Sequence, residues 1–246
     1  ADPELVHNWN AYFQAYGGYK IGLTWQGNPK HQADRMRSMP LAELGALGKL
    51  KGIQLFSLQK GAGVEQLDNL AGALDIVPLG ARLDESVPAF MDTAAVLRNL
   101  DLLITTDTAI AHVAGALGVP TWLALSYVPD WRWLLDRGDS PWDPSLRLFR
   151  QRAVGDWTSV VQSMVEELLR LSPRIQRRQA EDYRVATAGR NRLVRYGPPY
   201  VFPPIRKRHL FVRDRGREDH SLGVRRTREW ISSIEAMDRR PSCCVP

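Results

Sequence analysis

The sequence has very little cysteine and no long run of apolar residues. Its only two cysteines, Cys243 and Cys244, are adjacent and lie near the end of the 246 residues, a placement that argues against a disulfide framework or a zinc site. No apolar run approaches the roughly 20 residues that a membrane-spanning helix needs. No charged-then-apolar leader is visible at Ala1, so we expect a cytoplasmic protein.

Lysine is nearly absent from the last third of the chain, and this part alone carries the excess of positive charge. Residues 1–172 contain 15 Lys and Arg against 19 Asp and Glu, whereas residues 173–246 contain 18 against 8. In that second part arginine outnumbers lysine 17 to 1. The change of composition places a boundary at Ser172-Pro173.

The basic tail, residues 173–246, allows three interpretations. Basic clusters at 206–208 and 225–226 would suit a tail that binds nucleic acid or a membrane surface. The prolines between 196 and 204 prevent a helix there, and the segment would suit disordered polypeptide without a selected function. Translation of the wrong frame in GC-rich DNA would give the same Arg, Pro and Gly content. We favour the last two, so nucleic acid is not an expected partner.

Residues 20–172 alternate between apolar runs and helical patterns. The runs predict strands at 20–25, 53–58, 74–79, 102–105, 121–125 and 146–149, and helices at 41–50, 64–70, 88–100, 107–119 and 156–171. Such alternation predicts an α/β domain: a Rossmann-like parallel sheet with helices on both faces and right-handed crossovers. We therefore divide the chain into a helix at 1–19, this domain at 20–172, and the tail.

The segment from Asp107 to Pro120 is the most informative part of the sequence. It follows an apolar strand and opens a helix rich in small residues, and Asp107 or Thr108 can cap that helix. The first amides of a helix lack internal partners and, with the helix dipole, favour bound phosphate. Thr108 and His112 are four residues apart and face the same side. A hydroxyl, free amides and an imidazole would then converge on one anion.

Two further polar loops follow predicted strands, at 26–37 and 59–63. Ligands of parallel sheets bind beyond the carboxyl ends of the strands. These loops and the 105–112 segment should therefore open on one edge of the sheet, where we expect the ligand.

Several motifs appear together and in order. They are GLTWQGNPKH at 22–31, RSMPL at 37–41, SLQKG at 57–61, DTAA at 92–95, the block at 107–120, DWRW at 130–133, DSPW at 139–142 and RLFRQ at 147–151. Residues 20–171 thereby resemble the C-terminal half of a GT-B glycosyltransferase, above all the domain that follows tetratricopeptide repeats in bacterial proteins. That domain is related to ADP-heptose:lipopolysaccharide heptosyltransferases and, more distantly, to protein O-GlcNAc transferases.

The resemblance implies a site for a nucleotide-sugar donor. In the family an Asp-Thr-Gly-x-x-His block meets the donor phosphates, which implies this role for Asp107, Thr108 and His112, with Ala109 in place of the glycine. In relatives, a basic residue three positions before a proline also contacts phosphate, and Arg37, three positions before Pro40, matches that residue. Gln26, Asn28 and Lys60 complete the expected donor-binding residues.

Each of these residues also has a purely structural interpretation. Asp107 and Thr108 would serve as helix caps, Gln26 and Asn28 would bond their own turn, and Lys60 and Lys30 would be solvated lysines. His112 would be an ordinary hydrogen-bonded histidine. Asp92 would stabilise the start of its helix. We expect Trp131, Trp133 and Trp142 to pack over the sheet edge rather than to bind sugars.

The implied reaction is sugar transfer from a nucleoside diphosphate, with Arg37, Lys60 and the helix amides stabilising the leaving diphosphate. The family generally needs no metal, and we expect no cofactor. The family's other domain supplies the acceptor site and the base, but only about 19 residues precede the first strand. Residues 1–18 resemble the helical linker between the two domains. We therefore expect an inactive donor-binding fragment that lacks its partner domain and repeats, with a protein or glycan acceptor. The alternative is an inactive nucleotide-binding or interaction module.

Overall fold

The computed structural model describes residues 1–70 and 74–171, so the predicted basic tail lies outside the described residues. The helices are α1 (Pro3–Phe13), α2 (Asp34–Arg37), η1 (Leu41–Lys49), α3 (Gln66–Asn69), η2 (Gly80–Arg82), α4 (Met91–Leu97), α5 (Ala109–Ala116), η3 (Trp131–Trp133) and a last helix at 157–171. The strands are β1 (Tyr19–Leu23), β2 (Ile53–Ser57), β3 (Ile76–Pro78), β4 (Leu102–Thr106), β5 (Thr121–Leu125) and β6 (Leu146–Arg150).

All six strands are parallel and form one sheet in the order β3-β2-β1-β4-β5-β6. This is the strand order of a doubly wound sheet that reverses direction between β1 and β4. The register aligns Leu23 at the end of β1 with Ser57 of β2 and with Ile104 of β4. The carboxyl ends of the central strands therefore lie at one edge, and the predicted Rossmann-like α/β class is confirmed.

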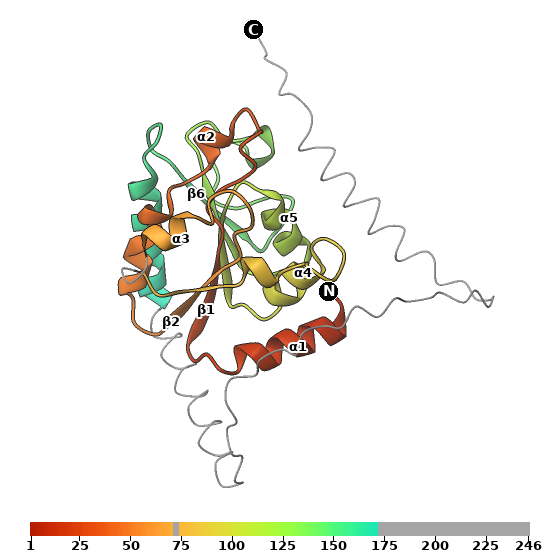
Figure 1. Ribbon diagram of the computed structural model, residues 1–246. Coiled ribbons are helices and arrows are strands. Elements are labelled where there is room, and N and C mark those ends of the chain that lie inside the picture. The colour runs from red at the N-terminus through yellow and green to blue at the C-terminus, as the bar shows by residue number, and fades with distance from the viewer. Residues whose placement is uncertain (71–73, 172–246) are drawn as a thin grey trace, which may run out of the picture. The chain divides into compact units, whose positions relative to one another are not determined.

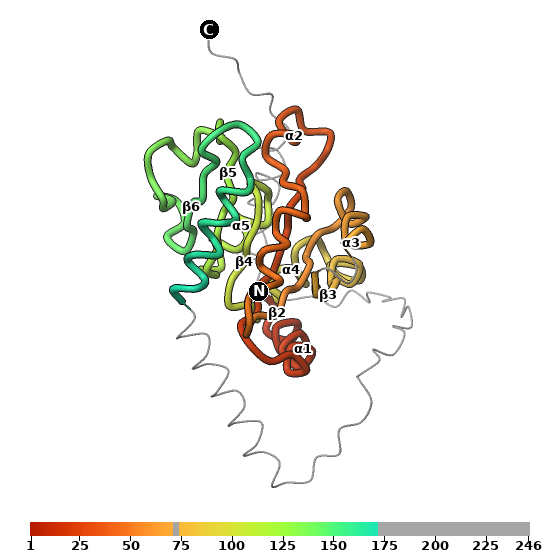
Figure 2. Tube along the Cα trace, turned by 90° about the vertical axis from the view of Figure 1, so that its left-hand side faces the viewer, coloured from red at the N-terminus to blue at the C-terminus, as the bar shows by residue number. Residues whose placement is uncertain are grey.

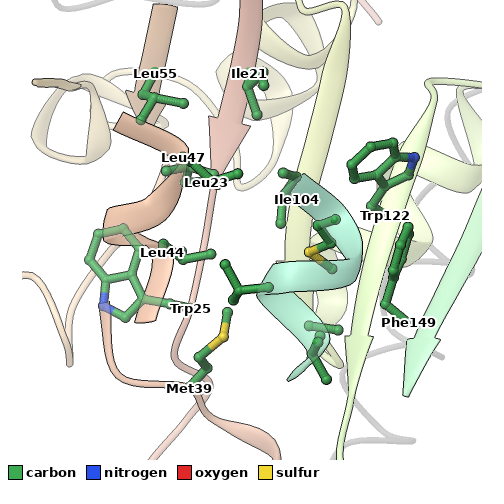
Figure 3. Packing of buried hydrophobic residues seen from close by; sticks show 14 of the residues in the cluster. Ile21, Leu23, Trp25, Met39, Leu44, Leu47, Leu55, Ile104, Trp122 and Phe149 are labelled. Carbon is green, nitrogen blue, oxygen red and sulfur yellow. The ribbon is translucent and has the colours of Figure 1, made fainter. Parts of the chain in front are cut away.

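Helices cover both faces of the sheet, as the alternating pattern predicts (Figures 1 and 2). One core joins η1 and the helix at 157–171 to the strands, and Figure 3 shows Leu44 and Leu47 packing toward Leu23 and Ile104. The other core joins α1, α4 and α5 to the opposite face. Both faces of the central strands are therefore dry, which explains why β4 and β5 are buried along their whole length.

The N-terminal helix α1 packs firmly on the second face. Asp2 caps it by accepting from the amides of Glu4 and Leu5. The indole of Trp9 donates to the carboxylate of Asp92 at 2.8 Å, which links α1 to α4. The expected linker role of residues 1–19 remains a prediction. No helix within the described ranges has the length and apolar content needed to cross a membrane.

Several helices differ from the prediction in type or start. Helices α3 and α5 begin at Gln66 and Ala109, two residues later than predicted, and two further helices differ more. Residues 41–49 form a 3₁₀ helix, in which the buried Leu41, Leu44 and Leu47 lie on one side because side chains three positions apart eclipse in that geometry. Helix α4 begins at Met91, not at Pro88, after Phe90 with φ +65°. Asp84 accepts from the amide of Asp92, and Asp92 accepts from the amide of Asp84. This reciprocal pair fixes the later start.

Candidate functional site

The loops that leave β1, β2 and β4 meet at the carboxyl edge of the sheet. The guanidinium of Arg37, from the loop after β1, donates to the backbone carbonyl of Asp107, after β4, at 3.0 Å. The side chain of Gln59, after β2, bonds the backbone of Trp25 and Gln26, after β1. The expected convergence of the three loops is therefore present in the structure.

Helix α5 begins with unbonded amides. Thr108 is its N-cap with φ −139° and ψ 168°, but its side chain caps no amide of the helix. The hydroxyl instead lies 3.3 Å from Oγ1 of Thr105 and 3.4 Å from the carbonyl oxygen of Thr106. The alternative interpretation of Thr108 as a side-chain cap is therefore wrong. Within the described part of the chain, the amides of Ala109 and Ile110 find no acceptor, so this helix start can accept an anion.

Arg37 brings a positive charge to this helix start. Its side chain is only 12% exposed, and its Nε lies 3.6 Å from the carboxylate of Asp34. Asp34 also accepts from the hydroxyl of Ser38, which in turn accepts from the amide of Gly27. The loop after β1 thus folds around the guanidinium and holds it beside Asp107.

His112 lies one turn into α5 and stacks on Trp133, with ring centroids 5.3 Å apart and the planes 15° from parallel. Trp133 is fully buried. Burial lowers the pKa of His112, as does the positive charge of Arg132, while Asp107 and Asp143 oppose the shift. The imidazole is therefore mainly neutral near pH 7 and carries one N–H donor.

Gln59 is a residue of this site that the sequence reasoning did not single out. It is 4% exposed. Its Oε1 accepts from the amides of Trp25 and Gln26, and its Nε2 donates to the carbonyls of Gln26 and Ala62 at 2.9 and 2.8 Å. One buried amide therefore joins two loops. The sequence feature that could have indicated this role is a polar residue directly after a buried strand.

The remaining predicted residues lie in less direct positions. Asn28 is exposed, and its side chain accepts from the amide of Lys30, so it serves its own turn. The side chain of Gln26 instead accepts from Gln66 at 3.1 Å. Lys60 donates to the carbonyl of Leu83. Lys60 is thereby held toward the loop after β3, and no contact between it and the start of α5 is seen among the described residues.

A pocket of about 330 Å³ lies beside this edge, at the ends of β2 and β3. Gln59, Lys60, Gly61, Val64, Gly80, Ala81 and Glu85 line it. A Cβ on Gly80 would come within 1.9 Å of the carbonyl oxygen of Gln59. The absence of a side chain at Gly80 therefore lets the two loops approach and form the pocket floor. Its volume is at the lower end of the range of small-ligand sites.

Trp133 also contributes to this site, although the sequence analysis predicts only a packing role for it. The residue is buried, as that prediction requires, and its ring also stacks on the imidazole of His112. Trp131 and Trp142 are 74% and 62% exposed, so the expectation that they pack over the sheet edge is wrong.

Within residues 1–70 and 74–171, no cluster of three or more His, Cys, Asp and Glu side chains is arranged to hold a metal ion. Metal independence stays a prediction.

No family model matches the chain. Among curated proteins, it is 30% identical to Protein FlbA of Caulobacter vibrioides over 165 residues, which cover 63% of this chain and 26% of FlbA. The chain thus spans about a quarter of the length of that relative.

Solved glycosyltransferase structures resemble the chain at low identity. E. coli ADP-heptose lps heptosyltransferase II is 14% identical, with a TM-score of 0.47 over 70% of this chain and 53% of that one. A glycosyl transferase family 9 protein from Veillonella parvula is 14% identical, with a TM-score of 0.46 over 68% and 52%. E. coli heptosyltransferase WaaC with ADP-2-deoxy-2-fluoro heptose is 18% identical, with a TM-score of 0.41 over 61% and 44%. The fold class itself rests on the strand order and register of the sheet.

Proposed function

We propose that this chain binds the nucleotide-sugar donor of a glycosyltransferase, as the C-terminal half of a GT-B enzyme of the kind that follows tetratricopeptide repeats. The observation that carries the proposal is the hydrogen bond from Arg37 to the carbonyl of Asp107. It ties a guanidinium to the backbone of Asp107, two residues before Ala109, whose amide is the first unbonded one of α5. Guanidinium and helix-start amides both suit phosphate oxygens.

The diphosphate would lie at the start of α5 and the nucleoside would extend toward β2 and β3. The strands β4 and β2 are two positions apart in the sheet, about 10 Å at the usual spacing. The pocket of Gln59 and Lys60 lies in that direction. Lys60 would then meet the nucleoside end of the donor, while Arg37, Thr108 and His112 meet the phosphates.

In the transfer the bond between the sugar's anomeric carbon and the diphosphate oxygen breaks, and its electron pair stays on the diphosphate. The acceptor hydroxyl forms the new bond and gives up its proton to a base. The charge of Arg37 and the dipole of α5 would stabilise the leaving diphosphate. On this proposal the acceptor site and the base belong to a second domain, and we assign no base to the described residues.

Calorimetric titration of the full chain with UDP, GDP, ADP and dTDP tests the proposal. We expect one of them to bind with a dissociation constant of about 1 mM or tighter. Thermal stabilisation by the same nucleotide should follow from its preference for the folded state. Failure of all four to bind at concentrations that saturate a millimolar site would overturn the proposal.

The second candidate is a nucleotide-binding module without transfer activity. This candidate is favoured because the described residues offer groups that suit phosphate, while no catalytic base is assigned among them. Neither candidate predicts release of nucleoside diphosphate by this chain alone, so the two are separated by joining the chain to the second domain that the first proposal requires and following release from the matching nucleotide sugar. Release in that context would support the glycosyltransferase, and binding without release would favour the module.

A further inference from the structure

Three threonine hydroxyls lie in a row from the interior of the sheet to the start of α5. Oγ1 of Thr24, directly after β1, lies 2.6 Å from Oγ1 of Thr105 on β4. Oγ1 of Thr105 in turn lies 3.3 Å from Oγ1 of Thr108, the N-cap of α5. Thr24 and Thr105 are buried and Thr108 is half-buried. This row, the threonine network, therefore leads from a dry interior to the proposed phosphate site.

The contacts of Thr105 fix the direction of the first hydrogen bond in the network. A hydroxyl has one proton to donate and two lone pairs that accept. The proton of Thr105 has an acceptor in the carbonyl oxygen of Thr106, at 2.9 Å. Within the described residues, Oγ1 of Thr24 has no hydrogen-bond partner other than Thr105. Thr24 therefore donates to Thr105, and this short bond holds the Thr105 hydroxyl in place.

The hydroxyl of Thr108 has only long contacts in the described part of the chain. It lies 3.3 Å from Oγ1 of Thr105 and 3.4 Å from the carbonyl oxygen of Thr106. Both distances exceed the range of roughly 2.5–3.0 Å that is usual for O–H···O bonds. The same hydroxyl caps no amide of α5. Its proton can therefore turn toward a ligand at the helix start with little loss of internal bonding.

An anion at the start of α5 would align the three hydroxyls. Thr108 then donates to the anion, and one of its lone pairs becomes free to accept from Thr105. Thr105 turns its proton from the carbonyl of Thr106 to Thr108, while it still accepts from Thr24. All three bonds then run in one direction, and hydrogen bonds in such a series strengthen one another. The Thr106 carbonyl loses a donor, a cost that a charged acceptor offsets because its hydrogen bonds are about twice as strong as neutral ones.

We propose that Thr105 is a positioning residue of the phosphate site: its buried hydroxyl, held by Thr24, turns the hydroxyl of Thr108 toward an anionic oxygen. This inference rests on the proposed function, in which the anion is the diphosphate of the donor. Thr105 itself touches no ligand and acts only through Thr108.

Calorimetric titration of the full chain with inorganic pyrophosphate, UDP, GDP, ADP and dTDP tests the network. Thr105→Val keeps the branched shape of the side chain and removes the hydroxyl. For the ligands that the wild type binds, we expect its dissociation constant to be about five- to tenfold higher than that of the wild type. Thr105→Ser retains the hydroxyl and should stay within about threefold of the wild type.

Thr121→Val is the matched control. Thr121 is fully buried on the neighbouring strand β5, and its hydroxyl donates to the carbonyl of Val119 at 2.9 Å. Removing this hydroxyl should lower the melting temperature about as much as Thr105→Val does, but it should leave ligand binding unchanged. A purely structural role of Thr105 would give the two variants the same binding behaviour.

A double-mutant cycle with Thr108→Val tests whether Thr105 acts through Thr108. In the Thr108→Val background, Thr105→Val should change the dissociation constant by less than about twofold, since the hydroxyl that it positions is already absent. Thr24→Val is a second variant, which leaves both Thr105 and Thr108 in place. It should weaken binding about two- to threefold, so the network can be tested even if Thr105→Val does not fold.

The outcomes separate the network from the proposed function. Ligand binding that Thr105→Val and Thr24→Val leave at the wild-type affinity overturns the network and leaves the proposed function intact. An equal loss from Thr105→Val with and without Thr108→Val also overturns the network alone, because Thr105 would then act by another route. Failure of the wild type to bind pyrophosphate or any of the nucleotides overturns the proposed function and the network together.

Discussion

The guanidinium of Arg37 donates to the backbone carbonyl of Asp107, although seventy residues separate them along the chain. This contact joins the loop after β1 to the start of α5 across the point where the sheet reverses direction. Such a point opens a crevice in a doubly wound sheet, because the adjoining loops turn to opposite faces. Arg37 therefore has two roles, as a tie between loops and as the cation of the proposed phosphate site.

Replacing Arg37 should weaken nucleotide binding, and it should also destabilise the fold because the buried Asp34 carboxylate loses its charged partner. Arg37→Ala removes a hydrogen bond from a charged donor, for which ~1.5–3 kcal/mol is typical, so the dissociation constant should rise by about tenfold or more. Calorimetry with the nucleotide that the wild type binds gives the measurement. Arg35→Ala on the same short helix is the control, since Arg35 is exposed. Equal effects of the two substitutions would argue against a specific role for Arg37.

The positions of the strands along the chain were predictable because each buried strand is a short apolar run between polar segments. Leu102 to Ile104 and Thr121 to Leu125 lie inside the sheet and are covered on both faces, so their sequences are mainly apolar. The exact helix starts were less predictable. The start of α4 depends on Asp84 and Asp92 bonding each other's backbone across an eight-residue loop, and no periodicity records that contact.

The places of the candidate-site residues in the fold were predictable where they join a strand to the next helix, but the contacts that they make across the fold were not. Asp107 and Thr108 could be placed because they separate β4 from α5. Gln59 and Trp133 were missed as contributors because their roles depend on contacts with Gln26 and His112, which lie far away in the sequence. Lys60 was expected near the diphosphate, but its ammonium group bonds the backbone of another loop.

Gly27 should be a sensitive position for the orientation of Arg37. A Cβ at Gly27 would come within 2.7 Å of the Asp34 carboxylate and 3.0 Å of the Arg37 guanidinium. Gly27→Ala should therefore push the guanidinium away from Asp107 and weaken nucleotide binding severalfold, with a stability loss of about 1–3 kcal/mol from overpacking. The matched control is Gly45→Ala, because nothing lies within 4 Å of a Cβ there. Nucleotide affinity measured by calorimetry that stays at the wild-type value in Gly27→Ala would contradict this account.

Gln59 should contribute more to stability than any exposed glutamine. Gln59→Ala leaves the amides of Trp25 and Gln26 without their acceptor in a buried place. An unpaired buried polar group costs ~1–3 kcal/mol, so we expect the free energy of unfolding to fall by about 2–4 kcal/mol in urea titrations. Gln162→Ala on the last helix is the control, since its side chain is exposed. Comparable midpoints for the two variants would show that the Gln59 contacts contribute little.

Protonation of His112 should make the fold less stable in mild acid. Its pKa in the folded chain is lowered from 6.5, chiefly by burial and then by Arg132, against the opposing charges of Asp107, Asp143 and Asp130. The unfolded state therefore binds a proton more readily, so stability due to His112 is complete above pH ~6.5 and is lost as the pH falls toward the folded pKa. Burial raises the pKa of Asp143, which lets its protonation offset part of the loss at lower pH.

Thermal unfolding between pH 7.5 and pH 5 measures this effect. Between those limits the melting temperature of the wild type should fall more steeply than that of His112→Gln, which has no proton to gain at this position. His7→Gln, at an exposed site on α1, should retain the wild-type slope. A bound diphosphate should reverse the trend, because its negative charge near His112 favours the imidazolium. If His112→Gln and the wild type show parallel curves with and without nucleotide, then His112 neither titrates as its burial implies nor lies near the bound phosphates.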